Sequence, residues 1–180
     1  MRTRDLALIA MFAALLIGVQ FALSFVAGIE LVSMVLLTFS AVFGWKRGMI
    51  TAVVFCLLRC IIFGAVPSVL VLYLLYYPFY ALVCAFCGKI KTFWRRYAVL
   101  ITAAVLMTIS FTLLDDVITP LMMSFNKKAW LMYFYASTPV MLTQTICSAV
   151  SVAALYPPLS KLLEKLKISY FDNYGYNGVA

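Results

Sequence analysis

Long apolar runs, separated by short segments with glycine, proline or charged residues, follow one another along most of the chain. A helix that crosses a membrane needs about 20 predominantly apolar residues, and most of these runs approach that length. The pattern predicts six membrane spans, at about 6–25, 31–45, 49–63, 69–87, 97–114 and 130–155. The first run is long for the apolar part of a signal peptide, so we expect a retained helix there.

The segments between the runs predict where the spans turn. Gly28–Glu30 is expected to turn the chain after the first span, Gly44–Gly48 after the second and Gly64–Ser68 after the third. The longest outer loop is expected at 115–128. Pro157–Pro158 is expected to end the sixth span, because proline lacks the N–H that a helix interior requires.

The residues after the last span are more polar. Leucines and lysines are interspersed over 159–168, a pattern typical of a short amphipathic helix lying at the membrane surface. Residues 170–180 contain glycine and asparagine, and we expect a flexible tail there.

The composition favours an integral membrane protein with little mass outside the bilayer. The chain is 66% hydrophobic and 11% charged, whereas soluble domains are about half apolar and a quarter charged. Six spans of about 20 residues leave too little chain for a separate domain of about 100 residues. The expected fold is therefore one all-α integral membrane domain over 1–180, with six transmembrane helices.

The positive residues predict the orientation of the spans. With both termini in the cytoplasm, eleven of the fourteen Lys and Arg residues fall inside. Only Lys127 and Lys128 fall outside, and Arg59 lies within the third span. Cytoplasmic loops carry an excess of positive residues, so this topology is favoured. Because the basic residues lie between apolar runs, the net charge of +8 indicates the orientation in the membrane and does not indicate nucleic-acid binding.

The residue inventory excludes several kinds of chemistry. The chain has no histidine, which removes imidazole catalysis and His-ligated metals. No phosphate-binding loop of the GxxxxGK[ST] type occurs, so the chain is not expected to hydrolyse ATP. Cys84 and Cys87 form a single CxxC pair, too few ligands for a zinc site. We expect no catalytic residues, metal or cofactor, and expect the cysteines to pack as small apolar residues.

One face of the first span is lined with small residues. Ala10, Ala14, Gly18 and Ala22 recur every four residues and therefore share a helix face. Such faces let another helix approach closely in lipid. Two interpretations follow: the face packs inside the protein's own bundle, or it docks onto a separate membrane protein.

The outer half of the third and fourth spans carries aromatic and charged side chains. Tyr73, Tyr76, Tyr77 and Tyr80 lie mostly on one helix face. They form either an interfacial aromatic belt or a surface for an aromatic ligand, with Tyr73, Tyr77 and Tyr80 as the predicted contacts. Arg59 either extends to the outer surface or pairs with an anionic group.

Further polar residues fall in the same half of the predicted bundle. Glu30, Asp115 and Asp116 lie at the outer ends of spans, and Asp115 or Asp116 could cap a helix or pair with Arg59. Adjacent helical residues diverge by about 100°, so Asp115 and Asp116 cannot act as a facing catalytic pair. Gln144 lies at mid-depth in the sixth span and must face protein or a cavity. We predict an outward-facing ligand site that includes Arg59, Asp115, Asp116 and Gln144.

Two short motifs and the overall plan resemble a known family. The segment Ala10–Ala14 has the AxxxA pattern, and Phe43–Gly48 (FGWKRG) forms a basic turn between the second and third spans. Together with six spans in about 180 residues, they resemble the substrate-binding subunits (S components) of energy-coupling factor (ECF) vitamin transporters. The resemblance covers essentially the whole chain.

The resemblance implies a transport role in the bacterial plasma membrane. Such subunits capture a vitamin or related micronutrient from outside, in a pocket at the outer ends of spans four to six. They dock through the first span onto a transmembrane coupling subunit that two cytoplasmic ATPases drive, and they are thought to topple in the membrane during transport. No signature assigns the chain to one vitamin.

Three other functions remain open from the sequence. A membrane scaffold of the rod-shape-determining type has similar size and span number, but it has no need for polar aromatic residues in the outer half of the membrane. An intramembrane enzyme would require a nucleophile and base or a metal cluster, for which the chain without histidine offers few residues. A small transporter that acts alone is the third.

Overall fold

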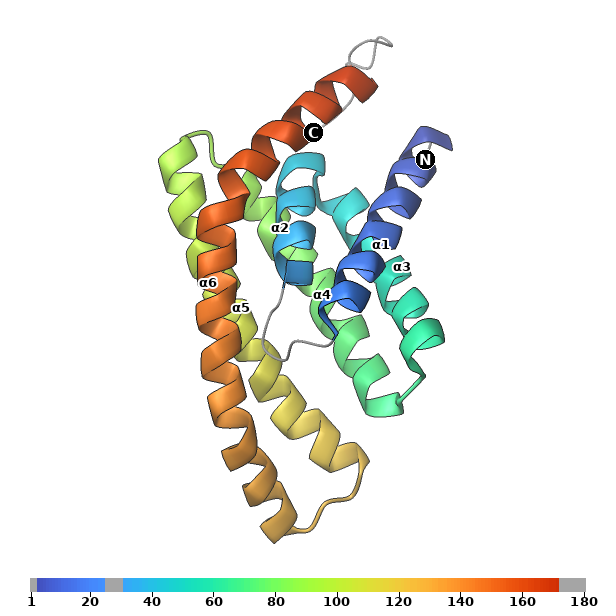
Figure 1. Ribbon diagram of the computed structural model, residues 1–180, viewed down its shortest axis with the longest axis vertical. Coiled ribbons are helices and arrows are strands. Elements are labelled where there is room, and N and C mark those ends of the chain that lie inside the picture. Colours follow the sequence, from blue (N-terminus) through green and yellow to red (C-terminus); the bar gives the residue numbers. More distant parts are fainter. Residues whose placement is uncertain (1–2, 25–30, 172–180) are drawn as a thin grey trace.

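The computed structural model describes residues 3–24 and 31–171, and these form an all-helical bundle without strands (Figure 1). This confirms the predicted all-α fold with six helices. The helices are α1 (Thr3–Leu23), α2 (Leu31–Phe43), α3 (Trp45–Phe63), α4 (Pro67–Gly88), α5 (Phe93–Met122) and α6 (Lys127–Phe171). The predicted turn at Gly28–Glu30, with Glu30 itself, and the predicted tail from residue 172 onward lie outside the described residues.

Four of the described helices are long and apolar enough to cross a membrane. They are α1, α4, α5 and the Lys127–Ser169 part of α6. Large apolar side chains cover much of their outer surface, including Phe21, Leu75 and Ile146. These features define a membrane protein, because a water-soluble bundle would present polar residues on this surface.

The shortest helix, α2, lies at the centre of the bundle and contacts all five other helices. Its 13 residues span about 20 Å at 1.5 Å per residue, less than the roughly 30 Å of a bilayer core. Leu36, Leu37 and Phe39 are almost completely buried. An apolar helix of this length is typical of a buried core, and α2 packs as one.

Glycine and proline set the turns at two of the expected places. Gly44 separates α2 from α3 with a φ of 88°, a left-handed conformation that glycine adopts without strain. Gly64 follows α3 with a φ of 92°, and α4 then starts with Pro67 in its first turn. Proline is well suited to that place because its missing N–H would have no helical partner.

Two predicted boundaries are wrong. The outer loop expected at 115–128 is mostly helix, because α5 continues to Met122 and α6 starts at Lys127. The double proline Pro157–Pro158 does not end the sixth helix, which continues through it to Phe171. In Figure 1 the last part of α6 leans away from the axis of the preceding part, toward the start of α1. The predicted amphipathic segment 159–168 is therefore an extension of α6.

The basic segments gather at one end of the molecule. The start of α1, the α2–α3 turn, the α4–α5 turn and the last part of α6 lie at the top of Figure 1. The α5–α6 turn, next to Lys127 and Lys128, lies at the opposite end. The two ends are called the basic end and the Lys127 end below.

Candidate functional site

Arg59, near the end of α3, lies against aromatic rings. Its guanidinium carbon is 4.1 Å from the centre of the Tyr73 ring and 5.8 Å from that of Phe63. Its Nε is buried without a hydrogen-bond partner. The ion pairs formed between described residues, Asp5–Arg47 and Arg96–Glu164, do not include it. Arg59 therefore presents a positive charge that aromatic faces stabilise in part.

The tyrosines of α4 do not share one environment. Tyr76, Tyr77 and Tyr80 are at most 3% exposed and pack in the core. Tyr73 is half-buried, beside Arg59. The ring of Phe111 on α5 lies 5.7 Å from that of Tyr73 and 4.7 Å from that of Tyr76. Of the predicted ligand-contacting tyrosines, Tyr77 and Tyr80 serve core packing in this structure, and Tyr73 lies at its edge.

Asp115 and Asp116 both hold α5 against α6. Asp115 accepts hydrogen bonds from Tyr133 Oη and from Thr119 Oγ1, both at 2.7 Å. Asp116 accepts a hydrogen bond of 2.8 Å from Ser137 Oγ. It is 4% exposed, and its Oδ1 has no hydrogen-bond partner. The two carboxylates therefore join the helices, and neither pairs with Arg59.

The backbone of the same region adds a third link between α5 and α6. Trp130 Nε1 donates a hydrogen bond of 2.8 Å to the carbonyl oxygen of Asp116. Phe111 lies four residues before Asp115, on the same face of α5. The Arg59–Tyr73 pair and the carboxylates thus occupy neighbouring turns toward the Lys127 end, with Phe111 between them.

Gln144 lies in the middle of α6 and is half-buried. The hydroxyl of the next residue, Thr145, is buried without a hydrogen-bond partner. On α1, the side-chain oxygen of Gln20 is buried and likewise lacks a partner. Buried polar side-chain atoms without a partner also occur elsewhere in the bundle, including those of Ser33 on α2 and Ser68 on α4.

Sequence reasoning missed several residues of this region. Tyr133 and Ser137 were not singled out, although their spacing of four places both on the α6 face that meets Asp115 and Asp116. Phe111 carried no signal, because aromatic residues are common throughout the chain. The spacing of Tyr133 and Ser137 could have been noticed, but only after α5 had been extended past Asp116.

The small-residue face of α1 is turned outward. Ala10, Ala14, Gly18 and Ala22 are all exposed, and a methyl group added at Gly18 would meet nothing within 4 Å. The opposite face of α1 packs on α2 and α3 through Leu8, Phe12 and Leu16, among others. The interpretation that the small residues pack inside the protein's own bundle is therefore wrong.

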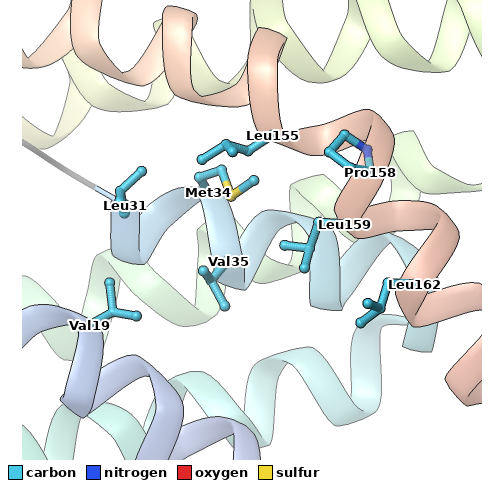
Figure 2. Close-up of a pocket in the computed structure, with 8 residues that line it drawn as sticks. All are labelled: Val19, Leu31, Met34, Val35, Leu155, Pro158, Leu159 and Leu162. Atoms are coloured by element: carbon cyan, nitrogen blue, oxygen red, sulfur yellow. The ribbon is translucent and has the colours of Figure 1, made fainter.

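An apolar groove opens next to this face (Figure 2). It has a volume of about 350 Å³ and lies between α1 and α6, with α2 as its floor. Val19 contributes from α1, Met34 and Val35 from α2, and Leu155, Pro158 and Leu159 from α6. The groove does not include the predicted ligand contacts, all of which lie elsewhere in the bundle.

The basic end is joined by ion pairs and a charged hydrogen bond. Arg47 Nε lies 3.0 Å from Asp5 Oδ1, and Arg96 Nη2 lies 3.2 Å from Glu164 Oε1. Lys167 Nζ donates a hydrogen bond of 3.0 Å to the carbonyl oxygen of Val42. Asp5 is 8% exposed, so the start of α1 is anchored to the α2–α3 turn. No spacing in the sequence predicts a contact between positions so far apart.

The cysteines are free thiols and pack among apolar side chains. Cys56, Cys60 and Cys84 are buried, whereas Cys87 and Cys147 are half-buried. Over the described ranges, no group of three or more His, Cys, Asp or Glu side chains is placed to hold a metal ion.

Fold and surface together define an all-helical membrane protein, with Arg59, Asp115 and Asp116 toward the Lys127 end and an outward small-residue face on α1. Comparison of the chain with protein families, curated proteins and solved structures gives no match.

Proposed function

We propose that this protein is the substrate-binding subunit of an ECF-type importer. In this proposal it captures a vitamin-like micronutrient at the Lys127 end, which faces the outside of a bacterial plasma membrane. Both termini are cytoplasmic. The chain docks through α1 onto a transmembrane coupling subunit, and two separate ATPases supply the energy.

The observation that carries the proposal is the outward small-residue face of α1. Ala10, Ala14 and Gly18 leave the helix backbone accessible to a neighbour, and helices in lipid associate largely through such close approach. Lipid alone does not require small residues, since apolar side chains of any size meet acyl chains equally well. A helix of another membrane protein is the partner that this face suits.

The charged and aromatic groups support a ligand site at the other end. Arg59 carries a charge that no carboxylate neutralises within the described part of the chain, and Tyr73 offers a ring beside it. Asp116 and Gln144 add polar atoms from α5 and α6. We expect such a site to take a small molecule with an anionic group and a flat ring.

One observation favours the scaffold of the rod-shape-determining type as a second candidate. Tyr76, Tyr77 and Tyr80 are packed in the core, so their burial is explained without any ligand. A scaffold would use the outward face of α1 for a protein partner but would bind no small molecule.

Purification from the native membrane under mild conditions tests the proposal. We expect mass spectrometry to detect ATPase subunits, a multispanning partner and a bound small molecule. Ala14→Trp should remove the partner proteins and keep the small molecule, because it blocks close approach on α1.

Leu15→Trp is the matched control, since Leu15 is the next residue and is 49% exposed but points about 100° away. It should retain the partner. A preparation that holds partner proteins but neither co-purifies nor is thermally stabilised by any vitamin would favour the scaffold.

A further inference from the structure

A second hollow borders the apolar groove between α1 and α6. It has a volume of about 500 Å³ and lies along the last part of α6, and Lys161 and Lys165 are among its lining residues. Pro158 and Leu162 line both hollows, so the two are neighbours along this helix. The groove is lined by apolar side chains, and the neighbouring hollow adds the two lysines.

The second hollow lies where α6 leaves the predicted membrane core. Leu155 ends the predicted sixth span, and Lys161 and Lys165 follow it by about two and three turns of the same helix. The lysines therefore lie on the membrane-surface side of the apolar side chains.

The positive charge at the end of the groove is available to a ligand. Lys161 and Lys165 are exposed and four residues apart, so they share one helix face. Glu164, the nearby acidic residue on α6, is paired with Arg96 at 3.2 Å. The third lysine of the segment, Lys167, donates to the carbonyl oxygen of Val42.

No helix of the described chain fills the groove. The backbones of α1 and α6 do not approach closely over the described ranges, and α2 forms the floor between them. Nearer the basic end, Leu8 of α1 and Leu163 of α6 belong to one apolar cluster with side chains of α2. Figure 2 shows the apolar side chains of the three helices around the space. In a membrane this opening faces the acyl chains of the surrounding lipid.

We propose that the groove binds one anionic phospholipid. An acyl chain lies between α1 and α6 against Met34 and Val35, and the phosphate lies at Lys161 and Lys165. Charge complementarity favours this occupant over a partner helix, because basic pockets between membrane helices near the surface are typical sites for anionic headgroups. The proposal rests on the chain being a membrane protein and is independent of the transported ligand and of the coupling partner.

Titration of the delipidated full-length protein with phosphatidylglycerol or phosphatidylcholine, followed by native mass spectrometry, tests this site. We expect one phosphatidylglycerol per chain, bound at least tenfold more tightly than phosphatidylcholine. Lys161→Ala with Lys165→Ala should weaken phosphatidylglycerol binding by about tenfold and leave phosphatidylcholine unaffected. Val35→Phe should weaken binding of both lipids, because the new ring occupies the acyl-chain position.

Two matched controls separate this site from general attraction to lipid. Lys127→Ala with Lys128→Ala removes the same charge at the other end, and Ile61→Phe adds a ring on a surface that is 79% exposed. Both should bind as the unmodified protein does. Equal loss in the two double-lysine variants, or a photo-crosslinker at Val35 that captures a protein in native membranes in place of lipid, would overturn the proposal.

Discussion

Arg59 is the residue whose position requires the most explanation. An arginine at the centre of a membrane helix costs about 2.5–3.5 kcal/mol on insertion scales, and the cost is smaller near a helix end. Arg59 lies four residues before the end of α3. Its cation–π contacts with Tyr73 and Phe63, worth about 0.5–2 kcal/mol, offset part of that cost.

Replacement of Arg59 separates ligand binding from packing. Under the proposed function, Arg59→Met should weaken binding of an anionic substrate by more than tenfold, about 1.4 kcal/mol. The same change should leave thermal stability equal or higher, because it removes a charge with a buried, unpaired Nε. Isothermal titration with the co-purified ligand and thermal unfolding in detergent measure the two effects. Unchanged affinity would show that Arg59 merely extends to the membrane surface.

A hydrogen bond from Tyr133 on α6 stabilises the carboxylate of Asp115 on α5. This carboxylate accepts hydrogen bonds from Tyr133 and Thr119, and hydrogen bonds to charged groups contribute about 1.5–3 kcal/mol. Tyr133→Phe should lower the free energy of unfolding by roughly 1–3 kcal/mol, measured by denaturation in detergent. Tyr135→Phe is the control, because Tyr135 is 69% exposed. Equal stability of the two variants would contradict the structural role of this hydrogen bond.

At the scale of elements, close helix contacts depend on particular glycines. A methyl group at Gly88 of α4 would lie 2.5 Å from the carbonyl oxygen of Ala41 on α2 and 2.6 Å from its Cα. Both are backbone atoms, so the two helices would have to separate. At Gly48 the nearest atom is the Ser40 side-chain oxygen, also at 2.5 Å, which can rotate away. Ser40 Cβ follows at 2.9 Å, so a smaller shift of the helices is needed there.

Alanine at these glycines should therefore have graded effects on thermal stability. Gly88→Ala should destabilise the protein most, in the range of 1–3 kcal/mol that overpacked sites show, and Gly48→Ala should destabilise it less. Gly18→Ala should be neutral or stabilising by up to about 1 kcal/mol, because alanine is the better helix former and the site is open. Thermal unfolding of the three variants in one detergent gives the order.

Some helix boundaries could be predicted from the sequence and others could not. Gly44, Gly64 and Pro67 act locally through φ or a missing N–H, so their effects were predictable. Asp115 and Asp116 resembled loop residues because their charges interrupt an apolar run. In the structure, Tyr133 and Ser137 on α6 satisfy these carboxylates. Charge alone could not reveal that hydrogen-bond donors lie on another helix.

At the scale of the molecule, the separation of basic residues between the two ends gives a test of topology. With both termini inside, Lys127 faces the exterior and Lys165 the cytoplasm. In intact cells, a membrane-impermeant maleimide should label Lys127→Cys and should label Lys165→Cys only after the cells are opened. The unmodified protein, with its five cysteines, provides the background.

The candidate site was predictable in composition but not in geometry. Charge and aromatic patterning singled out Arg59, Tyr73, Asp115 and Asp116, all of which lie toward one end. Which tyrosines enter the core depends on the rotation of α4 against its neighbours, and several apolar faces of that helix look equivalent in sequence. The direction of the α1 small-residue face was ambiguous for the same reason.

The central position of α2 has a consequence for how the protein is made. A segment of 13 residues is too short to be stable across a bilayer of about 30 Å on its own. Its partners α4, α5 and α6 follow it in the chain, so α2 gains most of its contacts only after they have been synthesised. Ribosome-bound chains that end before α4 should therefore leave α2 accessible to the insertion machinery. In this bundle α2 becomes buried only when the later helices pack around it.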